Sequence, residues 1–443
     1  MHTPLAAPYA ARLNVDYPQQ LDRLSTFFRL IWVIPIALVL ALLGGLSTPA
    51  QPTLAAQPSS DTPVGEQLAW TFDLLNTRAG ALTEADLATR FTPALLAAVP
   101  PPQLLGFAQQ LASAGPFTFQ GFTRPPQPTQ AVALVLGTGG LPFALSLSVE
   151  GSEPHRITGL NLVPVPAPAG VVLQPFSTDA EPDRVDGRVD IGGRSLYLTC
   201  RGTGSPTVVL ESGLTDLAAP WFAVESAVAG FTRVCSYDRS NAFGGASDPA
   251  PTPRTGSQMA SDLHAVLQTA EVPGPFVLVG HSIGGHVVRL YAAQYPAAVA
   301  GLVLVDASHE DQDARLQALI GPELWASRQQ ALAQGNSEGV ALETIAAEVR
   351  SALGPGGLPP TPLIVLTRGL PGDPSMFPPG WPVEAEAQLW RELQADLAGR
   401  VPGGRQVVAQ HSGHYIHQSE PGLVVEAIRE VVGAARQANQ TGK

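Results

Sequence analysis

The stretch Phe276-Val-Leu-Val-Gly-His-Ser-Ile-Gly-Gly285 decides the fold of the larger part of this 443-residue chain. Its first four residues form an apolar run typical of a buried strand, and a helical pattern begins at Gly284. Between them lies a G-x-S-x-G sequence centred on Ser282, in the order strand, sharp turn, helix that this motif requires. The two outer glycines leave room for the turn. We therefore expect Ser282 to be a nucleophile, with the Ile283 backbone N–H stabilising an oxyanion.

Strands and helices alternate on both sides of this turn, over residues 185–436. The expected strands are Val189–Ile191, Ser195–Arg201, Thr207–Glu211, Arg233–Asp238, Phe276–Gly280, Gly301–Asp306, Leu363–Thr367 and Arg405–Gln410. The expected helices are Ala218–Ala229, Gly256–Ala270, Gly284–Gln294, Glu384–Leu397 and Leu423–Val432. Such alternation is typical of an α/β domain with a mostly parallel sheet.

This region also resembles the α/β-hydrolase superfamily, from Val185 to Val432. The resemblance rests on four segments in order: TVVLESGLTD, FVLVGHSIGGHVVRLYAAQYP, LVLVDASHEDQ and SGHYIHQSEP. It implies an α/β-hydrolase fold with a mostly parallel eight-stranded sheet and a catalytic triad in the order serine, acid, histidine. It also implies a helical cap at 307–360, where helical patterns occur at Glu323–Ala333 and Leu342–Leu353. This chemistry needs no cofactor.

The resemblance assigns the catalytic base to His414, which follows the last expected strand in the sequence SGHY. Two residues compete for the acid: Asp306, directly after the sixth strand, and Asp373, in a Gly- and Pro-rich loop after the seventh. We favour Asp306, although a carboxylate that only hydrogen-bonds the nucleophile turn is an alternative interpretation. No metal site is expected at His411, His414 and His417, because acidic ligands are absent nearby.

The second oxyanion donor is expected to be the backbone N–H of Leu214, in the sequence ESGL that begins at Glu211. Many members of the superfamily have His-Gly here, and Ser212 departs from that pattern. The anchoring of this loop is therefore open. Glu211 could bind the loop or pair with Arg239.

An apolar run of twenty residues, Phe27–Leu46, is long enough to cross a bilayer as a helix. Three arginines precede or begin it, and the next positive charge is Arg78, which places residues 1–26 in the cytoplasm and the rest outside. We favour a retained single-pass anchor in the cell membrane. The alternative is a signal peptide cleaved near Ser47–Ala50, which would give a secreted protein.

A second unit is expected at residues 64–163, between a flexible linker at 47–63 and a Pro-rich linker at 164–184. Helical patterns come first, at Gly65–Leu75, Thr83–Ala88, Pro93–Val99 and Gln103–Ala112, and strands follow at Ala131–Leu136, Pro142–Val149 and Ile157–Val163. This order predicts a small α+β domain. The run LTEADLATRFTPALLAAVPPPQL resembles the cystatin-like domains that precede some extracytoplasmic serine hydrolases. We expect a spacer or a module that binds an unidentified protein partner.

Composition excludes several other functions. The net charge of −12 argues against a nucleic-acid-binding protein, and the only lysine, Lys443, ends the chain. Phosphate-binding loops and lysine Schiff bases are therefore absent. The superfamily's strand order would bring Cys200 and Cys235 onto adjacent strands, so they form either a disulfide or two buried thiols.

These features predict a membrane-anchored extracytoplasmic serine hydrolase that acts on a small acyl substrate: a carboxylic ester, thioester or amide. Ser282 would form an acyl-enzyme, and His414 and Asp306 would complete the triad. An acyltransferase using the same site is one alternative. A non-catalytic binding or scaffold protein with this fold is the other.

Overall fold

The structure is a computed structural model, and it describes residues 62–441 except 79–81, 113–114, 124–125, 139–141, 166–184, 243–244, 355–356, 373 and 375–376. The predicted anchor, Phe27–Leu46, lies outside the described residues. Within the described part of the chain, no helix is both long enough and apolar enough to cross a membrane.

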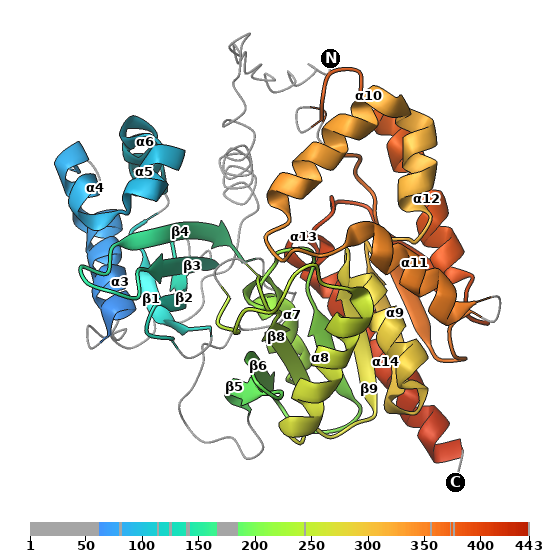
Figure 1. The fold of residues 1–443 in the computed structure, drawn as a ribbon. Coiled ribbons are helices and arrows are strands. Elements are labelled where there is room, and N and C mark those ends of the chain that lie inside the picture. The colour runs from blue at the N-terminus through green and yellow to red at the C-terminus, as the bar shows by residue number, and fades with distance from the viewer. Residues whose placement is uncertain are drawn as a thin grey trace, which may run out of the picture. The chain divides into compact units, whose positions relative to one another are not determined.

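The amino-terminal unit contains a β-sheet and several short helices (Figure 1). Its helical elements are α3 (Pro63–Asp73), a π-helical turn (Leu74–Arg78), α4 (Glu84–Arg90), α5 (Pro93–Ala98) and α6 (Pro101–Ala112). Its strands are β1 (Thr118–Phe122), β2 (Gln130–Leu136), β3 (Pro142–Val149) and β4 (Ile157–Pro164), which pair in that order, all antiparallel. The first strand is absent from the sequence prediction. It contains a register shift at Gly121, which breaks the alternation by which strands are recognised.

The carboxyl-terminal unit is built on an eight-stranded sheet, and all eight expected strands are present. They are β5 (Asp186–Asp190), β6 (Ser195–Arg201), β7 (Thr207–Glu211), β8 (Val234–Asp238), β9 (Phe276–His281), β10 (Val299–Val305), β11 (Leu363–Arg368) and β12 (Arg405–Ala409). Their order in the sheet is β12-β11-β10-β9-β7-β8-β6-β5. Only the pairs β5–β6 and β6–β8 are antiparallel, so the mostly parallel sheet of the expected α/β-hydrolase fold is confirmed.

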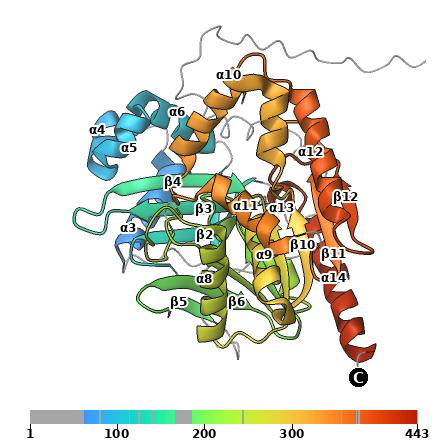
Figure 2. The ribbon, with the colours of Figure 1, turned by 45° about the vertical axis from the view of Figure 1, so that its right-hand side comes forward.

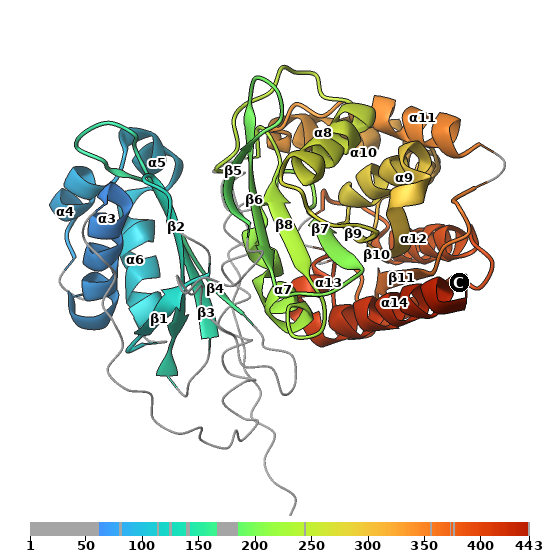
Figure 3. The same cartoon turned by 90° about the horizontal axis from the view of Figure 1, so that it is seen from below.

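Helices cover both faces of this sheet (Figure 3). One face packs against α8 (Gly256–Thr269), α9 (Gly284–Gln294) and α12 (Val383–Ala398), and the other against α7 (Phe222–Val228) and α14 (Pro421–Thr441). Helix α11 (Leu342–Leu353) packs on α8 and α9. A short helix, α13 (Ile416–Ser419), precedes α14. The central strands are buried on both faces, which explains why β9 and β10 are continuous apolar runs in the sequence.

The region between β10 and β11 carries α10 (Gln312–Gly335) and α11, where the cap was expected. Helix α10 bends at Gly321, which has a φ of 76° and is followed by Pro322. Figures 1 and 2 show the two limbs on either side of this bend. The sequence prediction began this helix only at Glu323. The preceding limb, in which Leu316 and Ile320 are buried, is separated from the predicted part by the bend at Gly321 and Pro322.

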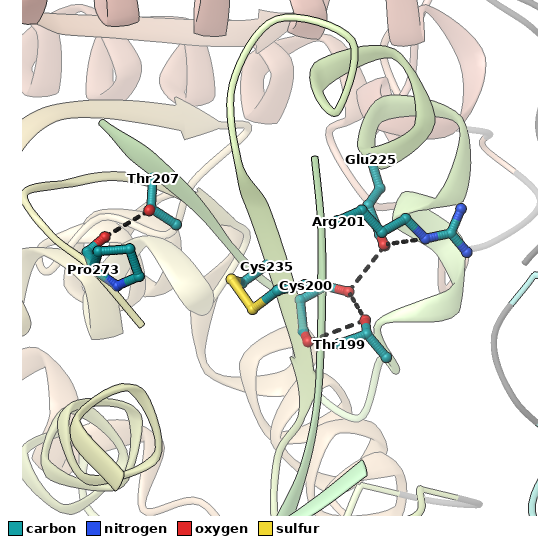
Figure 4. Close-up of a disulfide and its surroundings, with 8 residues drawn as sticks. Thr199, Cys200, Arg201, Thr207, Glu225, Cys235 and Pro273 are labelled. Atoms are coloured by element: carbon teal, nitrogen blue, oxygen red, sulfur yellow. Dashed lines mark hydrogen bonds and ion pairs between the residues drawn. A yellow bond between two sulfur atoms is a disulfide. The ribbon is translucent and has the colours of Figure 1, made fainter. Parts of the chain in front are cut away.

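Cys200 and Cys235 form a disulfide between β6 and β8 (Figure 4). The two residues are directly opposite each other in the antiparallel register, and both are buried. Of the two alternatives left open by the sequence, the structure contains the disulfide.

Candidate active site

Ser282 lies at the turn between β9 and α9, in the strained backbone conformation that the motif predicts. Its φ is 52°, and its N–H donates to the carbonyl of Val305 at 3.2 Å. A side-chain carbon at Gly280 would lie 2.7 Å from the Gly284 carbonyl oxygen, and one at Gly284 would lie 2.6 Å from that of Ser212. Both distances are too short for any residue but glycine. The turn therefore requires both glycines and holds the serine at the carboxyl end of β9.

Asp306 and His414 meet at the same edge of the sheet. Asp306 follows the last residue of β10, and His414 lies between β12 and α13. The His414 Nδ1 and the Asp306 Oδ2 are 2.7 Å apart. Because an ionised carboxylate only accepts hydrogen bonds, Nδ1–H is the donor, and Nε2 is left to accept a proton from a hydroxyl. The alternative acid, Asp373, lies outside the described residues.

Asp306 is fully buried and ionised. Burial raises its pKa, but the hydrogen bond from His414 and the positive charge of Arg368 outweigh burial, and the pKa falls to about 2. The carboxylate is therefore charged at neutral pH.

The loop that carries His414 is held by neighbouring histidines. The His281 Nε2–H donates to the His414 carbonyl at 3.0 Å, and His417 stacks on Trp221 with ring centroids 4.1 Å apart. Burial lowers the pKa of both His281 and His417, so both are neutral at pH 7. They orient the loop of His414. Over the described part of the chain, no group of three or more His, Cys, Asp or Glu side chains is placed to hold a metal ion.

The two expected oxyanion donors have free backbone N–H groups. Among the described residues, neither the Ile283 N–H nor the Leu214 N–H has a hydrogen-bond acceptor. Ile283 follows the nucleophile, and Leu214 lies in the loop after β7. Unpaired N–H groups on two different loops are what a developing oxyanion requires.

Arg239 anchors the loop that carries Leu214, which answers the question raised by Ser212. Its guanidinium donates to the Ser212 carbonyl at 2.7 Å and to the Gly213 carbonyl. It also pairs with Glu211 at 2.6 Å and with Glu338, from the segment between α10 and α11, at 2.7 Å. All three charged side chains are buried.

Glu338 also accepts a hydrogen bond from the Thr215 N–H at 2.5 Å. The cap region therefore contributes directly to the shape of the oxyanion loop. Sequence reasoning raised the pair of Glu211 with Arg239 but missed Glu338, since nothing in the local pattern marks a single glutamate 99 positions away in the chain.

A second buried ion pair holds the loop after Asp306 against the nucleophile helix. Arg289 of α9 pairs with Glu310 at 2.7 Å and donates to the Ser308 carbonyl at 2.9 Å. The Ser308 N–H in turn donates to the Ser282 carbonyl at 2.8 Å. The loops that carry Ser282 and Asp306 are thus fixed to each other.

Comparison with known proteins agrees with the fold of the carboxyl-terminal domain. Residues 206–381 match the family described as alpha/beta hydrolase fold, and residues 59–154 match the family described as ORF 12 gene product N-terminal. An AB hydrolase superfamily protein of Gibberella zeae is 23% identical over 299 residues, covering 55% of this chain and 92% of that protein. These matches and the strand order agree in giving the carboxyl-terminal domain an α/β-hydrolase fold.

Other relatives match over shorter parts. A putative carbamate hydrolase of Klebsiella pneumoniae, RutD, is 36% identical over 103 residues, which are 23% of this chain and 38% of that protein. A probable transporter of Hormonema carpetanum, efuK, is 28% identical over 145 residues, 31% of this chain and only 21% of the transporter. A solved structure of a thermophilic esterase from Thermogutta terrifontis is 22% identical, covers 58% of this chain and 99% of its own, and superposes with a TM-score of 0.40.

Proposed function

We propose that this protein, whose carboxyl-terminal domain has the α/β-hydrolase fold, is a serine hydrolase that cleaves a carboxylic ester, thioester or amide. The observation that carries the proposal is the 2.7 Å hydrogen bond between Asp306 and His414 at the sheet edge that also bears Ser282. The Ser282 N–H donates to the carbonyl of Val305, the residue before Asp306, so the nucleophile and the acid are held at the same edge of the sheet.

In this mechanism the Ser282 hydroxyl attacks the acyl carbon while His414 Nε2 takes its proton. Asp306 holds the imidazole in the tautomer with Nδ1 protonated and stabilises the imidazolium that forms. The negative charge that develops on the acyl oxygen is bound by the N–H groups of Ile283 and Leu214. His414 then protonates the leaving group. Water, activated by the same imidazole, releases the acid from Ser282 and restores the enzyme.

The proposal includes a membrane anchor at Phe27–Leu46 and a catalytic domain outside the cytoplasm. The apolar run with its preceding arginines supports the orientation. The Cys200–Cys235 disulfide supports an oxidising compartment. We assign residues 64–163 a cystatin-like fold and the role of a spacer or partner-binding module between the anchor and the catalytic domain.

Labelling of the full chain with a fluorophosphonate probe, together with hydrolysis of short p-nitrophenyl esters and a matching carbamate, tests the proposal. The carbamate is included because of the similarity to a putative carbamate hydrolase. Ser282→Ala should abolish both labelling and turnover. Ser226→Ala is the matched control, because its buried hydroxyl has no hydrogen-bond partner in the described part of the chain. If folded wild-type protein is not labelled and hydrolyses none of these substrates, the hydrolase proposal is wrong and the protein is a non-catalytic scaffold.

A further inference from the structure

Asp306 is surrounded by more donors than a triad acid needs. Its Oδ2 accepts from His414 at 2.7 Å and from the Arg368 guanidinium at 3.0 Å. Its Oδ1 accepts from the Trp390 Nε1–H at 2.7 Å and from the Arg368 backbone N–H at 2.9 Å. Four donors thus converge on one buried carboxylate, and one of them carries a full positive charge.

Arg368 is itself held in place at the carboxyl end of β11. Its second terminal nitrogen pairs with Glu386 of α12 at 2.7 Å, and its guanidinium carbon lies 4.4 Å from the centre of the Trp390 ring. The side chain is only 11% exposed, so solvent screens its charge weakly. The end of the seventh strand, where the sequence offered Asp373 as an alternative acid, therefore carries a cation directed at the acid of the sixth strand.

The charges around Asp306 come from three directions. His414 reaches it from the loop after β12, Arg368 from β11, and Glu386 from α12 lies behind Arg368. From β9, His281 contacts the His414 carbonyl and is neutral. A carboxylate beside an imidazole favours the imidazolium, and a cation nearby opposes it. Arg368 therefore offsets part of the charge that Asp306 presents to His414.

We propose that Arg368 is a positioning residue of the triad: tethered by Glu386 and Trp390, it fixes the Asp306 carboxylate and sets the pH above which the site becomes active. The inference rests on the proposed function, because it assigns Asp306 and His414 their catalytic roles. It goes beyond that function by making the pH range depend on a charged side chain that contacts neither the nucleophile nor the oxyanion donors. Trp390 contributes a neutral donor to Oδ1, so it acts on position and not on charge.

The test is the pH dependence of kcat/KM for four variants of the full chain. Arg368→Gln removes the cation and should move the acid limb of the profile to higher pH by about one unit. Arg368→Lys keeps the charge and should leave the limb near the wild-type position. Glu386→Gln frees Arg368 from its counter-charge and should move the limb to lower pH. Trp390→Phe keeps an aromatic ring but removes the indole N–H donor, so kcat should fall with no movement of the limb.

The opposite signs of Arg368→Gln and Glu386→Gln distinguish this proposal from a structural role, which would lower activity without moving the limb. An acid limb that stays within about 0.3 units of wild type in folded Arg368→Gln overturns it. Should Arg368→Gln fail to fold, Glu386→Gln and Arg368→Lys decide. In that case, an acid limb that does not move in Glu386→Gln, or that moves to higher pH by a full unit in Arg368→Lys, counts against the proposal.

A second readout separates failure of this inference from failure of the proposed function. In Ser282→Ala, for which we expect no turnover, the proton between His414 Nδ1 and Asp306 should give a low-field proton resonance whose pH midpoint is followed by NMR. Adding Arg368→Gln should raise that midpoint by about one unit, even if the wild type hydrolyses nothing. An unchanged midpoint contradicts the role of Arg368, while absent wild-type turnover contradicts only the hydrolase.

Discussion

Replacing Asp306 with asparagine should cost far more activity than its small change in shape suggests. Trp390 and the Arg368 backbone N–H both donate to Oδ1, so the amide oxygen of an asparagine must occupy that position. Its NH₂ group then replaces Oδ2 and points a donor at His414 Nδ1, 2.7 Å away in the native protein. The imidazole is forced to accept at Nδ1 and to carry its proton on Nε2.

A His414 ring with its proton on Nε2 cannot accept a proton from Ser282. The expected loss in kcat/KM is roughly 10³–10⁴-fold, or about 4–5.5 kcal/mol of transition-state stabilisation. The assay is the hydrolysis of short p-nitrophenyl esters at pH 7–8, with Asp373→Asn as the matched control. We expect Asp373→Asn to stay within about threefold of wild type. Loss of less than tenfold in folded Asp306→Asn, or an equal loss in Asp373→Asn, would refute the assignment of the acid.

Three further predictions concern the surroundings of the site. Glu338→Ala removes the acceptor of the Thr215 N–H and one partner of Arg239, so kcat should fall by roughly 10–100-fold with little change in KM. The control is Glu343→Ala, at an exposed position in α11, which should have no effect on steady-state kinetics. An increase in KM alone would argue that Glu338 shapes only the binding pocket. The Cys200–Cys235 disulfide closes a 35-residue loop, so its reduction should lower the free energy of unfolding by about 3–4 kcal/mol in a urea titration. An unchanged midpoint of urea unfolding, with both thiols confirmed to be free, would contradict this. The lowered pKa of Asp306 means that its charge stabilises the folded state above pH 3.8 and that this contribution, about 2 kcal/mol, disappears as the pH falls through 2. Urea unfolding of wild type and Asp306→Asn should therefore differ most above about pH 4 and converge only below about pH 2. A gap of the same size at about pH 5 and about pH 1.5 would contradict the linkage.

The sequence predicts the fold of the catalytic domain well because its signals are local and consistent. Each strand of the central sheet is a short apolar run, and each covering helix has its own periodicity. The strand β1 and the first limb of α10 were missed for the opposite reason. A bulge at Gly121 breaks the alternation in β1, and the bend at Gly321 and Pro322 separates the first limb of α10 from the part that was predicted.

The residues that tune the site could not be predicted from the sequence. Asp306 and His414 follow strand ends and were expected to meet, and the structure brings them together. Arg368 and Trp390 lie 62 and 84 positions from Asp306 and reach it only because β11 pairs with β10 and α12 packs on β11. Glu386 of α12 acts one contact further away, through Arg368. Their roles depend on burial and orientation. The sequence around a single arginine, tryptophan or glutamate does not reveal whether its side chain is buried or which way it points.

The central claim is that Ser282 is the nucleophile of a hydrolase, and intact mass spectrometry after fluorophosphonate treatment tests it most directly. The account predicts one adduct per chain, mapped to the peptide that contains Ser282, and none in Ser282→Ala. Complete absence of an adduct in folded wild-type protein, or an adduct on another serine, would contradict it.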